Sequence, residues 1–209
     1  DLAWQAAADL RALVQGGAAI ADGGQLLLTD RSGAPSRVVF GSLVFFVIER
    51  EGRLAVRLRD RNWAARRPPP DLSFYDYDPA WRVEAFWQRL ATPQSMEVPN
   101  VGGEMKVVEV THQAVVGIAM QAVTLLPISV SDSEVFFVFR DRTSGRETYG
   151  AGRFLKAPVA VDGKITLDFN FAYSPPCAFT PFATCPLPPP ENWLPFAVPA
   201  GEKKWEEDV

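Results

Sequence analysis

The 209-residue chain has a single histidine, His112, and two cysteines. A Ser-His-Asp or Cys-His catalytic arrangement would have to use this imidazole, which lies in the stretch 111–113 that we interpret as a surface turn. Zinc is disfavoured because Cys177 and Cys185 are eight residues apart, whereas zinc-binding cysteines are spaced by about two to four residues. We therefore predict no metal site and no cofactor.

Positive charge and long apolar runs are also scarce. The chain has 21 Lys and Arg against 25 Asp and Glu, so it lacks the general attraction for phosphates that a nucleic-acid partner requires. The longest apolar run, Leu43 to Ile48, is far shorter than the roughly 20 residues of a transmembrane helix. Because the first residue is Asp1 rather than methionine, we expect that upstream residues have been removed. Cytoplasmic location and export after loss of a leader both stay open.

Apolar residues, in contrast, are plentiful, at 47% of the chain with six Trp and fourteen Phe. A chain of this length buries about 70% of its unfolded surface, so its core needs neither a metal nor a disulfide. We predict a single domain over residues 1–209. Its parts are an N-terminal helix (1–17), a β core (18–170) and a proline-rich C-terminal clasp (171–209).

The apolar period changes early in the chain. Leu2, Ala6, Leu10 and Leu13 recur at helical spacing before Gly16-Gly17, which predicts an amphipathic helix over residues 2–14. After it, short alternating runs are separated by turn residues, which is typical of antiparallel β structure. We predict a mainly β fold: an antiparallel sandwich or barrel-like sheet with one N-terminal helix and a long ordered C-terminal loop rich in Pro and Cys.

Two tight hairpins are expected, at Glu51-Gly52 and at Asp162-Gly163, because glycine supplies the positive φ that a two-residue turn needs. The stretch from Trp81 to Leu90 alternates apolar with charged residues, which predicts a strand with one buried face. The predicted strands are 25–29, 43–49, 53–59, 81–90, 105–110, 122–126 and 134–140, together with the hairpin 158–170.

Two proline-rich stretches lack strand patterns. Residues 61–71 are predicted to form an irregular surface excursion. Residues 174–199 carry aromatic side chains such as Phe179 and Trp193 among their prolines, so we expect this segment to be ordered and packed on the sheet. Such a segment either caps the core or carries a binding site.

The C-terminal part resembles a known family. The matching motifs include Asp168-Phe169-Asn170, Pro175-Pro176-Cys177, Cys185-Pro186-Leu187, Glu191-Asn192 and Gly201-Glu202. They are similar to the signature of an uncharacterised bacterial and archaeal family, domain of unknown function 1684. The resemblance implies a fold and the location of a site but no activity. At three positions where the family tends to have Arg, Asn and Arg, this chain has Phe171, Ser174 and Trp193.

Polar residues of these motifs form the candidate ligand-binding site: Arg153, Asp168, Asn170, Tyr149, Asn192 and Glu202. An arginine can pair with a carboxylate or phosphate of a ligand through two parallel hydrogen bonds. The alternative is structural. Asp168 and Asn170 would then accept backbone N–H groups as in Asx turns, while Arg153 forms a buried salt bridge.

The cysteines Cys177 and Cys185 have three interpretations. A disulfide between them would stabilise the fold by about 2.6 kcal/mol in the chain-entropy model. Alternatively, the two thiols are simply buried, or one is a redox or nucleophilic thiol whose pKa is lowered by a nearby cation.

Charged and aromatic residues elsewhere suggest further surfaces. Arginines are concentrated between Arg53 and Arg67, which fits an edge strand protected by charge or, alternatively, a surface for an acidic protein. The stretch Phe74 to Asp78 either enters the core or stacks on a planar ligand.

Three functional hypotheses follow. We favour a non-enzymatic β domain that binds a small molecule or a partner protein beneath the C-terminal loop, with Arg153, Asp168 and Asn170 orienting the ligand. The second is a thiol- or carboxylate-dependent enzyme in hydrolytic or redox chemistry, and the third is a structural subunit of a larger assembly. The oligomeric state is not predicted.

Overall fold

The computed structural model describes residues 13–14, 18–19, 26–50, 52–66, 70–118 and 120–205. Its contacts divide the chain into two compact units, residues 1–69 and 70–209. The predicted helix over residues 2–14 lies outside the described residues, except that Leu13–Val14 is a short strand, β1. The predicted division at residues 17 and 170 stays a prediction.

The first unit is one antiparallel sheet with the order β2-β1-β3-β4-β5. Its other strands are β2 (Ala18–Ala19), β3 (Val38–Phe40), β4 (Leu43–Arg50) and β5 (Arg53–Asp60), and a short turn of 3-10 helix, η1 (Asp30–Ser32), precedes β3. Gly52, with φ of 77°, lies in the turn that joins β4 to β5, as the predicted hairpin requires.

Two predictions for the first unit were wrong. Residues 61–66 form a helix, α1 (Arg61–Arg66), within the stretch that we expected to be irregular. The prolines at 68–70 dominate the pattern of that stretch, but proline restricts only its immediate predecessor and does not prevent a helix that ends two residues earlier. Residues 27–29, at the end of the predicted strand 25–29, have no regular structure.

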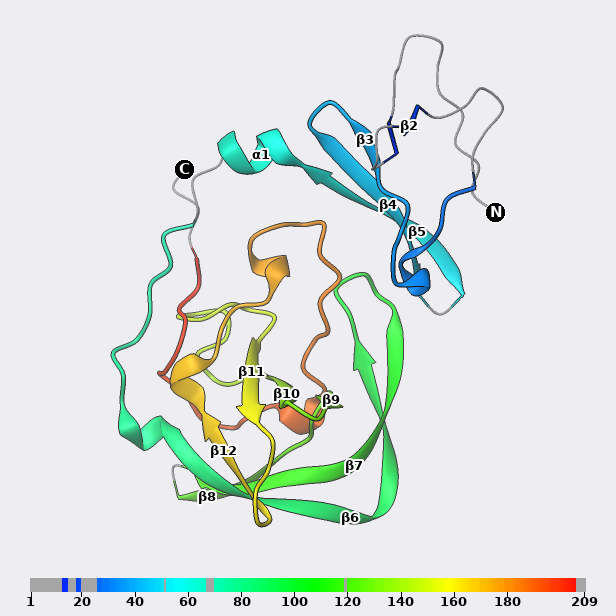
Figure 1. Cartoon of the computed structure of the whole chain (residues 1–209). Coiled ribbons are helices and arrows are strands. Elements are labelled where there is room, and N and C mark those ends of the chain that lie inside the picture. Colours follow the sequence, from blue (N-terminus) through cyan, green and yellow to red (C-terminus); the bar gives the residue numbers. More distant parts are fainter. Residues whose placement is uncertain are drawn as a thin grey trace. The chain divides into compact units, whose positions relative to one another are not determined.

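The second unit contains two antiparallel sheets (Figure 1). The larger has the order β12-β6-β7-β8, with β6 (Arg82–Pro99), β7 (Met105–Ile118), β8 (Gln121–Leu125) and β12 (Lys164–Asp168). A turn of 3-10 helix, η2 (Pro79–Trp81), leads into β6. The smaller has the order β11-β10-β9, with β9 (Ser129–Val130), β10 (Glu134–Phe139) and β11 (Arg153–Pro158).

Strands β6 and β7 are much longer than we predicted. Their register shifts between Arg89 and Gln94, and a bulge of this kind bends both strands. Beyond it, the two strands continue as a curved two-stranded ribbon that leaves the four-stranded sheet (Figure 1). His112 therefore lies within β7, and our interpretation of residues 111–113 as a turn was wrong.

Side chains from both sheets enclose one hydrophobic core. Its members include Ala85, Leu125, Phe137, Leu155 and Leu167, all at most 1% exposed. Burying a phenylalanine or leucine side chain contributes roughly 2–3 kcal/mol. The predicted alternation in β6 is confirmed, since Ala85 is buried and Trp81, Val83 and Trp87 pack on the same core. The mainly β, antiparallel fold predicted from the sequence is thus correct.

The C-terminal segment covers both faces of the small sheet. It includes three short turns, η3 (Phe169–Phe171), η4 (Pro176–Ala178) and η5 (Pro190–Asn192). On one face, Leu194, Phe196, Val198 and Ala200 join the main core. On the other face, Cys185 packs against Val138 of β10 and Phe154 of β11. None of the described helices is long and apolar enough to cross a membrane.

Candidate functional site

Arg153, the first residue of β11, is fully buried at the centre of the candidate site. Nη2 donates to Asp141 Oδ2 at 2.8 Å and to the Val198 carbonyl at 2.9 Å, and Nη1 donates to the Ala200 carbonyl. Its guanidinium carbon lies 5.2 Å from the centre of the Phe139 ring. The guanidinium therefore ties the C-terminal segment to the small sheet.

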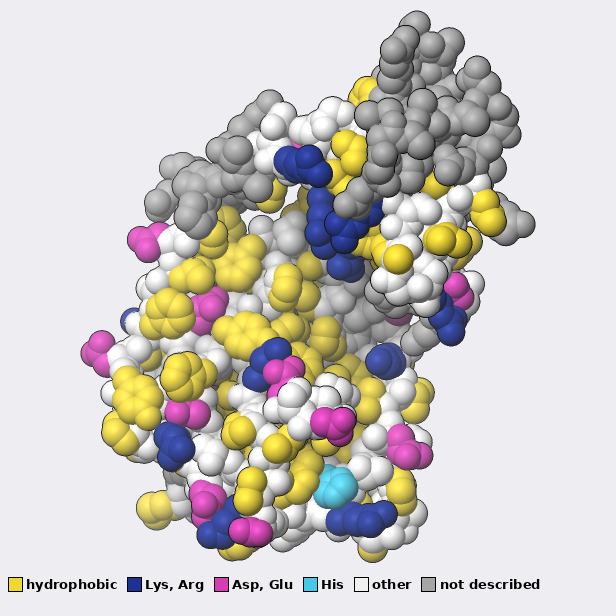
Figure 2. Space-filling view, viewed as in Figure 1, with side chains coloured by type: hydrophobic (Ala, Val, Ile, Leu, Met, Phe, Trp, Pro, Cys, Tyr) yellow, Lys and Arg dark blue, Asp and Glu magenta, His cyan; other side chains and the backbone are white. Residues whose placement is uncertain are grey.

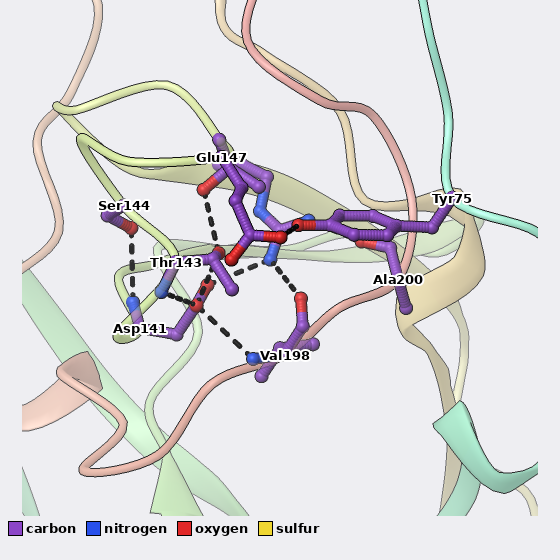
Figure 3. Close-up of polar contacts among 9 residues, drawn as sticks. Tyr75, Asp141, Thr143, Ser144, Glu147, Val198 and Ala200 are labelled. Atoms are coloured by element: carbon purple, nitrogen blue, oxygen red, sulfur yellow. Dashed lines mark hydrogen bonds and ion pairs between the residues drawn. The ribbon is translucent and has the colours of Figure 1, made fainter.

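Asp141, the partner of Arg153, also accepts several hydrogen bonds (Figure 3). Its Oδ1 accepts from the N–H and the hydroxyl of Thr143, at 2.7 and 2.6 Å, and from the N–H of Val198 at 3.2 Å. The Thr143 hydroxyl also lies 2.9 Å from that of Thr148. Both side chains of the Arg153–Asp141 pair are 0% exposed, so each charge is balanced by the other and by hydrogen bonds.

Two glycines allow the chain to pass close to this pair. Gly152 has φ of 94°, and a Cβ there would lie 2.5 Å from Pro188 Cγ and 2.6 Å from the Phe139 carbonyl oxygen. Gly201 has φ of 79°, and a Cβ there would clash with the carbonyl oxygens of Ala172 and Phe169. Only glycine combines this backbone conformation with such close approach.

Tyr75, from the stretch Phe74 to Asp78, and Glu147, which we did not predict, join the outer edge of the site (Figure 3). The Tyr75 hydroxyl donates to Glu147 Oε2 at 2.8 Å. Burial, followed by this hydrogen bond, raises the pKa of Tyr75 to about 12. The Lys203 ammonium lies 4.8 Å from the centre of the Tyr75 ring. Tyr75 and Glu147 are 72 residues apart in the sequence, so the sequence pattern alone does not connect them.

Asp168 and Asn170 form a second polar group, at the end of β12. The Asn170 amide accepts from the Asp78 N–H at 3.0 Å and donates to the Asp78 carbonyl at 2.9 Å. Asp168 Oδ1 accepts from the backbone and the side chain of Asn170, at 3.2 and 2.9 Å, and Arg82 lies 3.7 Å from its other oxygen. These contacts are those of the Asx-turn alternative.

Asn192 is completely buried in η5. Its Oδ1 accepts from the Leu126 N–H at 2.8 Å, while Nδ2 donates to the carbonyls of Leu126 and Val138 at 2.8 and 2.9 Å. No hydrogen bond or ion pair between described residues joins Arg153 to Asn192, Asp168 or Asn170. The candidate ligand residues thus form separate groups, and their role in binding stays a prediction.

Glu202 lies beside these groups. Its N–H donates to the Ala172 carbonyl at 2.8 Å, and its backbone forms a β-bridge with Phe74. Only 5% of the residue is exposed, and its Oε1 has no hydrogen-bond partner among the described residues. The same holds for Nε of Arg153 and the hydroxyl of Ser174. The described part of the site therefore retains some unused hydrogen-bonding capacity.

Residues 70–203, which contain all of these groups, match the model of a family described as a protein of unknown function (DUF1684). The chain belongs to the DUF1684 family. The solution NMR structure of an uncharacterized protein of Haloarcula marismortui is similar, with 35% identity and a TM-score of 0.52 over 63% of this chain and 75% of that one. A search of curated proteins gives no match. The resemblance seen in the sequence is confirmed.

Two of the three positions at which the resemblance implies another residue lie on the surface. Phe171 is 69% exposed and Trp193 is 53% exposed. Arg140 stacks on the Trp193 ring, with its guanidinium carbon 5.3 Å from the ring centre. Ser174, in contrast, is buried. At the two positions where the resemblance implies arginine, this chain therefore presents exposed aromatic rings.

Cys177 and Cys185 are free thiols in contact with each other. The Cys177 N–H donates to the Cys185 sulfur at 3.3 Å, and the Tyr149 hydroxyl donates to the Cys177 carbonyl at 3.1 Å. Burial raises the pKa of Cys185 to about 11, and burial, followed by the side chain of Cys177, raises the pKa of Tyr149 to about 12. Cys185 is therefore a protonated, weakly nucleophilic thiol at neutral pH.

The His112 side chain contacts two neighbouring residues, Trp87 and Thr111. Its ring stacks on Trp87 with the centres 5.3 Å apart and the planes 3° apart, and Nδ1 lies 2.9 Å from the Thr111 hydroxyl. Within the described ranges, no cluster of three or more His, Cys, Asp or Glu residues is arranged to hold a metal ion.

Proposed function

We propose that residues 70–209 form a protein-binding domain without catalytic activity, whose contact surface is the aromatic surface of Phe74, Tyr77 and Phe171. The observation that carries the proposal is their exposure: 55%, 57% and 69% of these residues is accessible to solvent. Large aromatic residues are the most frequent anchors of protein interfaces. Figure 2 shows hydrophobic side chains gathered along the flank where Figure 1 places residues 70–78.

The three residues lie on neighbouring segments. Phe74 pairs with Glu202, whose N–H donates to the carbonyl of Ala172, the residue after Phe171. Tyr77 precedes Asp78, which both accepts from and donates to the Asn170 amide. Hydrogen bonds that fix these segments in advance lower the entropy lost when a partner binds. The polar groups of the motif thus support the aromatic surface rather than contacting the partner themselves.

A protein partner fits better than a small molecule. Small-molecule sites are concave, and the hollows that we describe lie elsewhere: one at the bulge of β6 and β7, lined by Arg89, Pro93 and Thr111, and one in the first unit. Beneath the C-terminal loop, Cys185 packs directly on Val138 and Phe154. The raised pKa of Cys185 and the internal contacts of Arg153 and Asn192 support a role without catalysis.

The proposal is tested with Phe171→Ser, Tyr77→Ser and the matched control Phe86→Ser, which changes an aromatic residue 62% exposed on β6. Proteins that copurify with the tagged wild-type chain are identified by mass spectrometry, and the purified partner is titrated calorimetrically against each variant. We expect Phe171→Ser to weaken binding by about tenfold or more, as is usual for an interface hot spot, while Phe86→Ser binds like the wild type.

Equal binding by all variants would contradict the proposed surface. A copurifying small molecule that is lost in Phe171→Ser would contradict a protein partner and favour the small-molecule alternative. Native mass spectrometry of the same preparations distinguishes these outcomes.

A further inference from the structure

The first unit has a sheet edge with an unusual side-chain pattern. β5 is the last strand in the order β2-β1-β3-β4-β5, so only β4 pairs with it among the described residues. One face of β5 carries Leu54, Val56 and Leu58, which are 44%, 56% and 59% exposed. The opposite face includes Arg57 and Arg59, both exposed. An edge strand that combines open backbone groups with exposed apolar residues is a template for another strand.

The backbone direction of β5 can be assigned residue by residue. In an antiparallel ladder, successive residues point their N–H and C=O alternately toward the partner strand and away from it. The Arg61 N–H donates to the Ser42 carbonyl at 3.0 Å, and the β4–β5 register is continuous from Arg50↔Arg53 to Leu43↔Asp60. Odd-numbered residues of β5 therefore bond to β4. The N–H and C=O groups of Leu54, Val56 and Leu58 point to the open edge.

We propose that this edge binds an extended segment of another protein in which apolar and acidic residues alternate. Residues that face each other across an antiparallel pair lie on the same face of the sheet. An incoming strand would thus place apolar side chains opposite Leu54, Val56 and Leu58, and carboxylates opposite Arg57 and Arg59. The cationic face belongs to a chain whose net charge is −4, so it is a local feature suited to an acidic partner.

The same charges oppose pairing between two copies of this chain. An antiparallel pair of β5 strands centred on Val56 would place Arg53 of one copy opposite Arg59 of the other. A parallel pair would place each Arg57 near its counterpart. Like charges directly opposite each other destabilise a strand pair. The pattern therefore selects a strand of opposite charge over a second copy.

The probe is a fluorescently labelled synthetic peptide of alternating valine and glutamate, blocked at both ends, with a valine–lysine peptide of equal length as its control. Binding to the full chain is measured by fluorescence anisotropy. We expect the glutamate peptide to bind with an affinity that decreases as salt is added, because the ion pairs are exposed. The lysine peptide is expected to bind at least about tenfold more weakly.

Variants at Val56 and Arg57 separate the contribution of the backbone hydrogen bonds from that of the charges. Val56→Pro removes one outward N–H without touching the bonds to β4, a change that edge strands tolerate, whereas Val56→Ile keeps this N–H. We expect Val56→Pro to weaken the glutamate peptide by about tenfold and Val56→Ile by less than about twofold. Arg57→Glu, which leaves the backbone unchanged, is expected to weaken the glutamate peptide and to strengthen the lysine peptide.

Three results would overturn the proposal: no measurable binding of the glutamate peptide, equal affinity for both peptides, or equal affinity of the Val56→Pro and Val56→Ile variants. A dimer in light scattering that dissociates in Val56→Pro would assign the edge to a second copy instead. Circular dichroism establishes whether each variant is folded. If Val56→Pro is unfolded, Arg57→Glu still tests the proposal.

Discussion

At the scale of single residues, the protein places a full positive charge in its hydrophobic interior. The Arg153–Asp141 pair is completely buried, and its net energy relative to an apolar pair can be close to zero because both ions lose their hydration. Removing one partner is different, since the other charge is then left buried without compensation. Removing one residue of the pair should therefore strongly destabilise the fold, although the intact pair adds little stability compared with two apolar residues.

We predict that Arg153→Met lowers the free energy of unfolding by about 3–5 kcal/mol, because Asp141 loses its cation and two C-terminal carbonyls lose their donor. Urea denaturation measures the change. The matched control is Lys156→Met, whose partner Glu134 lies 2.8 Å away with both side chains about half exposed. Such exposed pairs contribute little to stability because water screens them. Losses of similar size in the two variants would contradict a structural role for Arg153.

The contacts of the candidate site residues could be predicted only in part from the sequence. The structural alternative for Arg153, a buried salt bridge, matches its contacts, and so does the Asx-turn alternative for Asp168 and Asn170. What could not be read was the identity of the partners. Asp141, which pairs with Arg153, lies twelve residues earlier in the chain, outside the candidate residues, and the sequence has no signal that joins the two. Tyr75 has no sequence signal that connects it to Glu147.

At the scale of elements, glycines decide how closely segments approach. Gly152 lies just before β11, where a Cβ would overlap Pro188 of the C-terminal segment and the end of β10. Gly163, in the turn before β12, has a similar positive φ of 74° but open space around it. Both positions have a positive φ but they differ in packing, so comparing them separates the cost of overpacking from the cost of a side chain at positive φ.

We predict that Gly152→Ala lowers the free energy of unfolding by about 2–4 kcal/mol, from the strained φ together with overpacking against Pro188. Gly163→Ala should lose only about 1 kcal/mol, from the strained φ alone. Chemical denaturation of both variants under identical conditions gives the comparison. If Gly152→Ala lost no more than Gly163→Ala, the C-terminal segment would not be held as tightly against β11 as its contacts indicate.

Elements were predictable where alternation or a turn residue marks them. β4, β5, β8 and β10 agree with prediction to within one residue at each end, and the Asp162-Gly163 turn is present with two backbone hydrogen bonds between Val161 and Lys164. The prediction failed where tertiary packing overrides the pattern. β6 continues past the register shift between Arg89 and Gln94 and pairs with β7 again from Gln94 to Pro99, and β11 was missed between two irregular stretches.

At the scale of the whole molecule, the boundary between the compact units and the start of the family match coincide at residue 70. The C-terminal segment belongs to the core of the second unit although it forms no regular strand. Buried and exposed residues alternate from Asn192 to Ala200, as in a strand, but prolines remove the donors that would let it pair. In the sequence, its prolines set the C-terminal segment apart from the β core. In the structure, its buried side chains are part of that core.

This difference can be tested by cutting the chain at either boundary. We predict that residues 70–209 fold alone and unfold in one cooperative transition, because both sheets and the segment that covers them are present. Residues 1–170, cut at the boundary that the sequence pattern suggested, should leave the second unit unfolded, since they lack the buried residues Leu194, Phe196, Val198 and Ala200. Removal of several such residues costs more than the roughly 5–15 kcal/mol that stabilises a typical domain. Circular dichroism and tryptophan fluorescence during denaturation distinguish the fragments. A folded second unit in the 1–170 fragment would show that the C-terminal segment covers the core without completing it.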